Sequence, residues 1–144
     1  MPDIHHSLII ETPSQDIFDG VSTPNGIDNW WAVSSEGQPV QGSVYNLGFG
    51  ELHPWRAIVT KSSPPHLLEM KFVQADPDWM STIVGFEIRE RTGISSELNF
   101  YHKGWKENNA HFKSSSYCWA MYLRILKRFL EKGEVIPYSD RLNQ

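Results

Sequence analysis

The sequence predicts an α+β fold in which a curved antiparallel sheet wraps around one long C-terminal helix. Residues 110–132 carry large apolar side chains at helical spacing, with most charged side chains on the other side. Five segments between residues 43 and 103 instead alternate apolar and polar side chains, as strands with one buried face do. One strand and two short helices precede them. The simplest two-layer arrangement of this β-α-α-β5-α order packs the apolar helix face on the apolar sheet face.

The predicted helix, residues 110–132, has the widest apolar face in the chain. Gly133 ends it, and Pro137 lies just beyond. Burying one large apolar side chain contributes about 1.5–3 kcal/mol, whereas an exposed charge pair contributes only a few tenths of a kcal/mol. Packing therefore decides where this helix lies. Its apolar face comprises Phe112, Trp119, Tyr122, Leu123, Ile125, Leu126, Phe129 and Leu130.

The five alternating segments span residues 43–49, 55–61, 67–73, 82–91 and 96–103. Turn-forming residues separate the later ones, including Pro64-Pro65, Asp76-Pro77-Asp78 and Thr92-Gly93. Short connections of this kind predict an antiparallel meander with one wet face and one buried face. The inward side chains are predicted to be Tyr45, Leu47, Phe49, Trp55, Ala57, Val59, Leu68, Met70, Phe72, Val84, Phe86, Ile88, Leu98, Phe100 and His102.

The first third of the chain predicts one strand, residues 7–12, and two short helices. Pro13 ends the strand, and Ser14 is expected to cap the first helix. Thr23 is expected to cap the second helix, which closes at Trp30 and Trp31. Residues 34–39 are polar and contain glycine, so we expect a loop there.

Composition limits the class of protein. The 144 residues, of which 40% are hydrophobic, suit a single domain over residues 1–144 with a real core. A net charge of −4 gives no sign of a nucleic-acid partner. No apolar run approaches the roughly 18 residues of a membrane span, and the N-terminus does not resemble a secretory signal. With one cysteine, Cys118, we expect a cytoplasmic protein without an internal disulfide.

Several stretches, in order and over nearly the whole chain, resemble one superfamily. They are residues 10–18, Trp30-Trp31, Gly42, residues 59–65, His102-Lys103-Gly104-Trp105, and the helix residues Trp119, Leu123, Leu126, Leu130 and Gly133. This pattern resembles the START-like and polyketide-cyclase-like (SRPBCC, helix-grip) superfamily. It is most similar to the bacterial branch resembling activators of the heat-shock chaperone ATPase. The resemblance implies a helix-grip fold. Because a strongly curved sheet that grips a helix rarely closes completely, we expect a cavity between sheet and helix. The resemblance leaves function open, since the superfamily includes lipid carriers, cyclases, hydrolases, hormone receptors and chaperone regulators.

His102 is the most informative polar residue, because the alternation turns it inward beside Phe100. A buried imidazole commonly hydrogen-bonds a neighbour and has no further role. Alternatively, it anchors a ligand head group or acts as a general base. The residues predicted to line a ligand cavity with it are Trp31, Trp55, Phe72, Phe86, Phe100, Trp105, Tyr117 and Met121. The same side chains would fill a core that has no cavity.

Three functions remain open at this stage. The first is a non-enzymatic module that binds a small hydrophobic or amphipathic ligand. The second is regulation of a chaperone ATPase in a stress response, with the basic residues Arg124, Lys127, Arg128 and Lys132 either solvated or docking an acidic partner. The third is a cyclase- or hydrolase-type enzyme that uses His102 with Tyr101, Tyr117 or Glu51. No metal site, phosphate loop or cofactor is expected, because the histidines lack ligand spacing and no Gly-x-Gly-x-x-Gly occurs.

Overall fold

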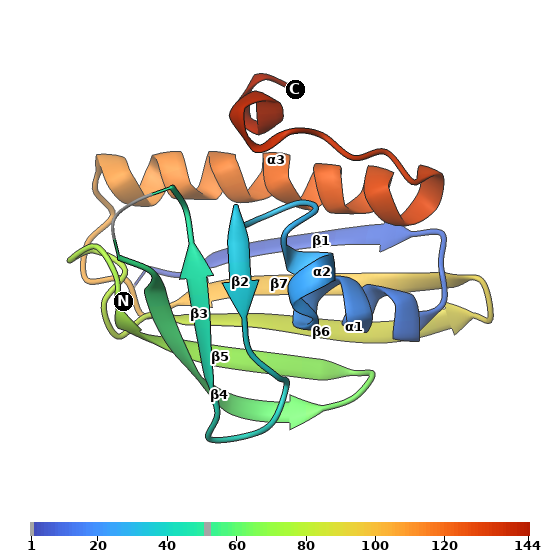
Figure 1. Ribbon diagram of the computed structural model, residues 1–144, viewed down its shortest axis with the longest axis horizontal. Coiled ribbons are helices and arrows are strands. Elements are labelled where there is room, and N and C mark those ends of the chain that lie inside the picture. The colour runs from blue at the N-terminus through green and yellow to red at the C-terminus, as the bar shows by residue number, and fades with distance from the viewer. Residues whose placement is uncertain (1, 51–52) are drawn as a thin grey trace.

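A computed structural model describes residues 2–50 and 53–144. It contains a seven-stranded antiparallel sheet with the order β1-β7-β6-β5-β4-β3-β2. The strands are β1 (Ile4–Ile10), β2 (Ser34–Glu36), β3 (Val44–Gly48), β4 (Trp55–Ser63), β5 (Leu67–Gln74), β6 (Ile83–Thr92) and β7 (Ser95–Lys103). The sheet curls so strongly that β2 and β3 run across the direction of β1, β6 and β7 (Figure 1). The α+β helix-grip prediction is confirmed.

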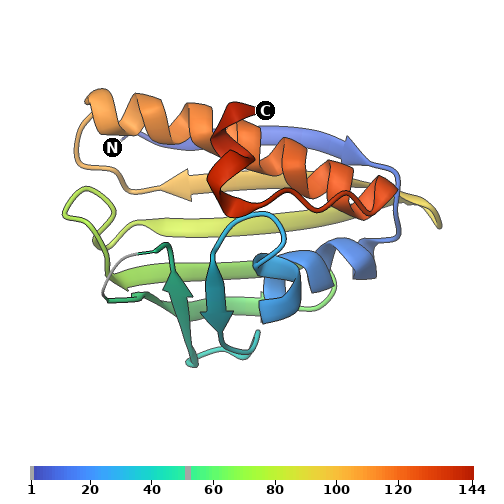
Figure 2. The ribbon, with the colours of Figure 1, turned by 45° about the horizontal axis from the view of Figure 1, so that its top comes forward.

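The long helix α3 (Ala110–Lys132) lies along the concave face of the sheet, beside β1 (Figures 1 and 2). Its predicted bounds are confirmed at both ends. The Asn109 side chain caps the first turn by accepting a hydrogen bond from the Phe112 amide at 2.9 Å. Gly133 ends the helix in the left-handed conformation, with φ 70°. Trp119, Leu123 and Leu126 of the predicted apolar face are buried.

The predicted inward faces of the strands are also confirmed. Register places inward residues opposite one another, so that Ile4, His102, Val84 and Met70 form one row across four strands. All four side chains are buried. Phe49 and Trp55, near one corner of the sheet, are the inward residues that stay partly exposed. The alternation in the sequence therefore identifies the core face of the sheet correctly.

The two short helices pack against the sheet, the first against β5, β6 and β7 and the second against β2. Helix α1 (Ser14–Ser22) begins one residue earlier than predicted, because Pro13 takes the cap position. The Ser14 hydroxyl instead bonds that of buried Ser96 at 2.9 Å. Helix α2 (Pro24–Ile27) has the predicted cap: the Thr23 hydroxyl accepts from the Gly26 amide at 3.0 Å. The prediction that α2 extends to the tryptophans is wrong, since it ends at Ile27.

The expectation of a loop over residues 34–39 is wrong in its first half. Ser34–Glu36 forms the edge strand β2, so that six strands rather than five follow the helices. Three polar residues cannot display an alternating pattern. Pairing with β3 makes this segment a strand, with Ser34 opposite Gly48 and Glu36 opposite Asn46. Gly48 permits the approach, because a Cβ there would lie 2.8 Å from the Ser34 hydroxyl.

After Gly133 the chain turns back along α3 and ends in the short 3-10 helix η1 (Tyr138–Asn143) (Figure 2). Ile136 and Arg141 are the buried side chains of this segment. The Arg141 guanidinium donates to the Ile136, Ala32 and Asp28 carbonyl oxygens at 3.0, 3.2 and 2.6 Å. The segment thereby connects α3 to the end of α2.

Candidate functional site

The space between the sheet and α3 is filled mainly by aromatic side chains. Trp30 and Trp31 stack with ring centroids 5.7 Å apart, and Trp31 lies 5.0 Å from Trp119. Phe100 approaches Trp119 from the sheet at 4.4 Å. The bulky side chains with essentially no exposure include Trp30, Trp31, Trp105, Trp119, Tyr45, Phe72, Phe86 and Phe100. Of the two alternatives left open for these aromatics, filling of the core describes most of them.

His102 is fully buried, and both of its ring nitrogens are hydrogen-bonded. Trp119 donates its indole N–H to His102 Nδ1 at 3.1 Å. An indole nitrogen can only donate, so Nδ1 is the acceptor and Nε2 carries the proton. Nε2 then donates to the Thr82 hydroxyl at 2.8 Å, and that hydroxyl donates to the Trp79 carbonyl at 2.6 Å. This chain fixes the ring as a neutral imidazole.

Burial also disfavours protonation of His102. Desolvation, assisted by the nearby His111, lowers its pKa to about 3 from the ordinary 6.5. A general base needs a free lone pair within reach of substrate, and the Nδ1 lone pair is already occupied by Trp119. The geometry therefore favours a structural role. Of its proposed partners, Tyr101 donates to Glu69 at 2.6 Å on the outer face of the sheet, and Glu51 lies outside the described residues.

A small pocket of about 170 Å³ lies beside the first half of α3. We call it the aromatic pocket. Helix α3 supplies one wall, Trp31 follows α2, and Trp79 lies in the connection between β5 and β6. Ser114 is exposed, whereas Trp31, Trp79 and Trp119 are buried, so the pocket runs inward from the surface. Its lining consists of Trp31, Trp79, His111, Ser114, Ser115, Cys118, Trp119 and Tyr122.

Polar groups also line the aromatic pocket, both near its opening and in its interior. His111 Nδ1 lies 2.9 Å from a carboxylate oxygen of Asp78, which holds the start of α3 against the β5–β6 connection. Trp79 donates its indole N–H to the buried Ser115 hydroxyl at 3.4 Å.

Burial raises the pKa of the Cys118 thiol, so this thiol is not an activated nucleophile. Burial likewise raises the pKa of Tyr122 to about 12, and Tyr138 contributes.

The structure brings only one of the predicted cavity residues to this pocket. Trp31 lines it. Phe72, Phe86, Phe100, His102 and Trp105 lie in the filled core, and Trp55 lies at its margin. The expected inward position of Tyr117 is wrong, because its side chain is 67% exposed. Met121 is half-buried on α3 and does not contribute to the pocket lining.

Sequence reasoning missed Trp79 and treated Trp119 and Tyr122 only as core residues. Trp79 directly follows the Asp76-Pro77-Asp78 turn, so strand alternation cannot assign it a face. A large aromatic residue beside a polar turn is the one available signal, since such a residue needs an apolar surface close by. The sequence correctly predicts that Cys118, Trp119 and Tyr122 lie on the helix. It gives no sign of the pocket beside them.

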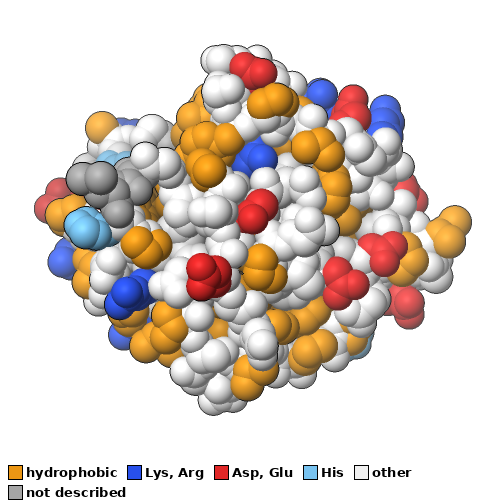
Figure 3. All heavy atoms as spheres, in the orientation of Figure 1, with side chains coloured by type: hydrophobic (Ala, Val, Ile, Leu, Met, Phe, Trp, Pro, Cys, Tyr) orange, Lys and Arg blue, Asp and Glu red, His pale blue; other side chains and the backbone are white. Residues whose placement is uncertain are grey.

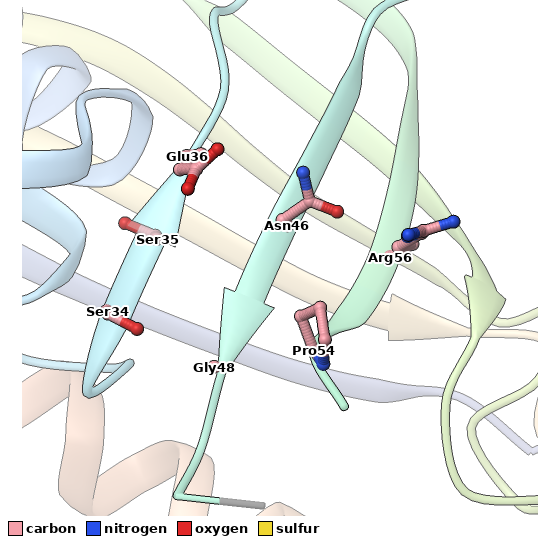
Figure 4. Close-up of a pocket in the computed structure, with 7 residues that line it drawn as sticks. All are labelled: Ser34, Ser35, Glu36, Asn46, Gly48, Pro54 and Arg56. Carbon is pink, nitrogen blue, oxygen red and sulfur yellow. The ribbon is translucent and has the colours of Figure 1, made fainter. Parts of the chain in front are cut away.

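A second hollow, of about 400 Å³, lies on the outer face of β2, β3 and β4 (Figure 4). Glu36, Asn46 and Arg56 occupy directly opposed positions on the three strands. Glu36 and Arg56 are exposed, as is expected of a solvated sheet face. The hollow also includes Ser34, Ser35, Gly48 and Pro54. It is polar, whereas the aromatic pocket offers apolar walls.

Other site classes find no support in the described part of the chain. Residues 2–50 and 53–144 contain no group of three His, Cys, Asp or Glu side chains placed to hold a metal ion. No helix among them combines the length and apolar character that crossing a bilayer requires. Acidic and basic side chains are interspersed on the face in Figure 3.

Residues 11–131 match the family described as Activator of Hsp90 ATPase homolog 1-like protein. The chain belongs to this family. The match begins just after β1, covers β2 to β7, α1, α2 and nearly all of α3, and ends before Gly133. The predicted superfamily and branch are therefore confirmed. Among curated proteins, none matches the sequence.

Solved structures share the fold. The solution structure of the Aha1 dimer from Colwellia psychrerythraea aligns with a TM-score of 0.82 and 27% identity, over 93% of this chain and 99% of that one. Protein SSP2350 from Staphylococcus saprophyticus aligns at 0.78 with 18% identity, over 94% and 96%. CalU16 from Micromonospora echinospora aligns at 0.72 with 20% identity, over 91% and 77%. The latter two likenesses concern the fold alone.

Proposed function

We propose that this protein is a non-enzymatic binding module that holds one small aromatic or other apolar group in the aromatic pocket. The pocket itself carries the proposal. A dry cavity of about 150 Å³ in another protein accepts benzene, so about 170 Å³ suits a single ring. Three tryptophans supply aromatic faces for it. His111 and Ser114 near the opening would suit a polar substituent, and hence an amphipathic ligand. A single free cysteine is consistent with a cytoplasmic location.

Thermal unfolding with phenol and indole as probes tests this proposal. A ligand present at about 100 times its Kd raises the free energy of unfolding by about 2.7 kcal/mol. We expect the Tm to rise with probe concentration and to saturate. Cys118→Phe places a ring in the pocket and should abolish that rise.

Ala120→Phe is the matched control, because it adds the same ring at an exposed position of the same helix. It should retain the wild-type response. If neither probe changes the wild-type Tm, or if both variants respond alike, the aromatic pocket is not a binding site.

A second candidate, regulation of a chaperone ATPase in a stress response, rests on the family membership. An acidic partner would need free basic groups on α3. Lys127 and Arg128 are already paired with Glu131 and Glu134 at 2.6 and 2.8 Å, whereas Lys113 and Arg124 are exposed. The candidate predicts that the purified protein changes the ATPase rate of Hsp90 and that Arg124→Glu weakens the effect. An unchanged ATPase rate would rule out this candidate function.

A further inference from the structure

Ser115 places a hydroxyl group in the interior of the aromatic pocket. It lies in the first half of α3, lines the pocket and is 6% exposed, whereas its neighbour Ser114 is exposed at the opening. Buried tryptophans supply apolar surface around it. In such surroundings a polar group that lacks a hydrogen bond costs free energy.

The Ser115 hydroxyl uses its oxygen in a hydrogen bond but not its proton. A serine hydroxyl has one proton to donate and two lone pairs that accept. The Trp79 indole N–H can only donate, so Ser115 Oγ is the acceptor of their 3.4 Å hydrogen bond. A helical serine can donate to a carbonyl of the preceding turn, as Ser114 does to His111 at 3.2 Å. Over residues 2–50 and 53–144, no protein group accepts the Ser115 proton.

An unused donor inside a pocket favours ligands that can accept from it. A ring that fills the pocket removes the remaining solvent from the Ser115 hydroxyl, and a buried donor without an acceptor is costly. Sites with a buried polar group therefore discriminate against ligands that cannot pair with it. The oxygen is held by Trp79, whereas the hydroxyl proton can rotate toward an acceptor in the pocket.

The charges around the pocket favour a neutral ligand. Among the described residues that line it, none is Lys or Arg. His111 Nδ1 lies 2.9 Å from the Asp78 carboxylate, which also accepts from the Asn109 side-chain amide at 3.4 Å. The pair of His111 and Asp78 carries no net charge if the imidazole is protonated, and a negative charge if it is neutral. A carboxylate on the ligand would therefore lack an opposing charge, which makes its burial costly.

We propose that Ser115 determines the specificity of the aromatic pocket: its hydroxyl donates to a neutral acceptor atom of the bound ring, such as a heteroaromatic nitrogen. This inference rests on the proposed function and adds the chemical class of the ligand. The acceptor atom points inward, toward α3 and Trp79. Any further polar substituent of the ligand lies at the opening, beside His111 and Ser114.

NMR titration of the isotope-labelled full-length protein with benzene and pyridine tests this role, at a pH at which pyridine is neutral. The two probes have the same shape, and only pyridine has an acceptor atom in its ring. Ser115→Ala removes the donor, and the loss of one hydrogen bond should weaken pyridine binding by about 3- to 10-fold relative to benzene. Both probes meet the same altered wall, including the Trp79 indole, so the ratio of their Kd values isolates the hydroxyl.

Ser114→Ala is the matched control, because it removes the neighbouring hydroxyl, which already donates to the His111 carbonyl. It should leave the ratio unchanged. Ser115→Cys is a second variant, which keeps a side chain of similar shape with a weaker donor. Its ratio should lie between those of the wild type and Ser115→Ala. Benzoate should bind to the wild type more weakly than pyridine.

The outcomes separate the role of Ser115 from the pocket itself. If both probes bind to the wild type and Ser115→Ala leaves their ratio unchanged, the hydroxyl only accepts from Trp79 and does not select the ligand, although the pocket binds rings. An equal change in Ser114→Ala would contradict the role of Ser115 as well, and tighter binding of benzoate than of pyridine would contradict the neutral ligand class. If neither probe binds to the wild type, the proposed function fails, and the role of Ser115 fails with it.

Discussion

At position 102, burial and hydrogen bonding act on a single imidazole and make stability depend on pH. The folded-state pKa is lowered to about 3, below the ordinary 6.5, so the unfolded chain binds more protons between these values. Stability from this group is therefore present above about pH 6.5 and is lost as the pH falls toward 3, by at most about 1.4 kcal/mol per pH unit. Urea unfolding between pH 7 and 4 should show this fall.

The contribution of His102 is isolated by comparison with His102→Gln, which does not titrate. The difference in unfolding free energy between wild type and variant should shrink as the pH falls. Parallel curves for wild type and His102→Gln would show that the imidazole is not neutral and buried in the fold.

On the outer face of the sheet, Tyr101 lies across Gly85 to reach Glu69. A Cβ at Gly85 would lie 2.0 Å from the ring of Tyr101. Gly85→Ala must therefore displace the ring and its 2.6 Å hydrogen bond to Glu69, at a cost of about 2–4 kcal/mol. Denaturant unfolding of Gly85→Ala and the wild type measures this loss of stability.

A double-mutant cycle identifies the cause of that loss. Added to Tyr101→Ala, Gly85→Ala should cost far less than it does alone. Gly93→Ala is the control, since a Cβ there meets nothing within 4 Å. Equal costs of Gly85→Ala in the two backgrounds would mean that the ring does not occupy this position.

At the scale of elements, α3 was predictable to the residue and β2 was not. Apolar periodicity over 23 residues, a capping asparagine and a terminal glycine all agree on the helix. β2 has three polar residues and exists because β3 offers a free edge. The side-chain direction of His102 followed from alternation. Its partners Thr82 and Trp119 come from other elements, and no sequence pattern encodes their distances.

Helix α3 should respond very differently to truncation on its two faces. Leu126 is fully buried between α3 and the rest of the core, so Leu126→Ala is expected to cost about 2–5 kcal/mol. Tyr117→Ala removes a larger side chain from the exposed face and should stay within about 0.5 kcal/mol. Guanidinium unfolding midpoints give both values. Similar costs would mean that the assigned docking face is wrong.

At the scale of the whole molecule, the fold holds its interior nearly full, and three buried tryptophans, Trp31, Trp79 and Trp119, lie between the aromatic pocket and the core. Trp31 lines the pocket and also contacts the rings of Trp30, Phe49, Phe72 and Trp119. Trp31→Ala should cost about 3–5 kcal/mol, because neighbouring side chains fill such a space only in part. The remaining space would join the pocket and create room for two fused rings.

Naphthalene should then raise the Tm of Trp31→Ala more than that of the wild type, because a ligand that fills the new space binds only the folded state. Phe86→Ala is the matched comparison: Phe86 is equally buried but lies away from the pocket lining, so its cavity has no access from the surface. Phe86→Ala should lose stability, and naphthalene should not raise its Tm. Equal recovery of the two variants would mean that the core admits ligand by a route other than the pocket, and no recovery of either would mean that the sheet closes on α3 once Trp31 is removed.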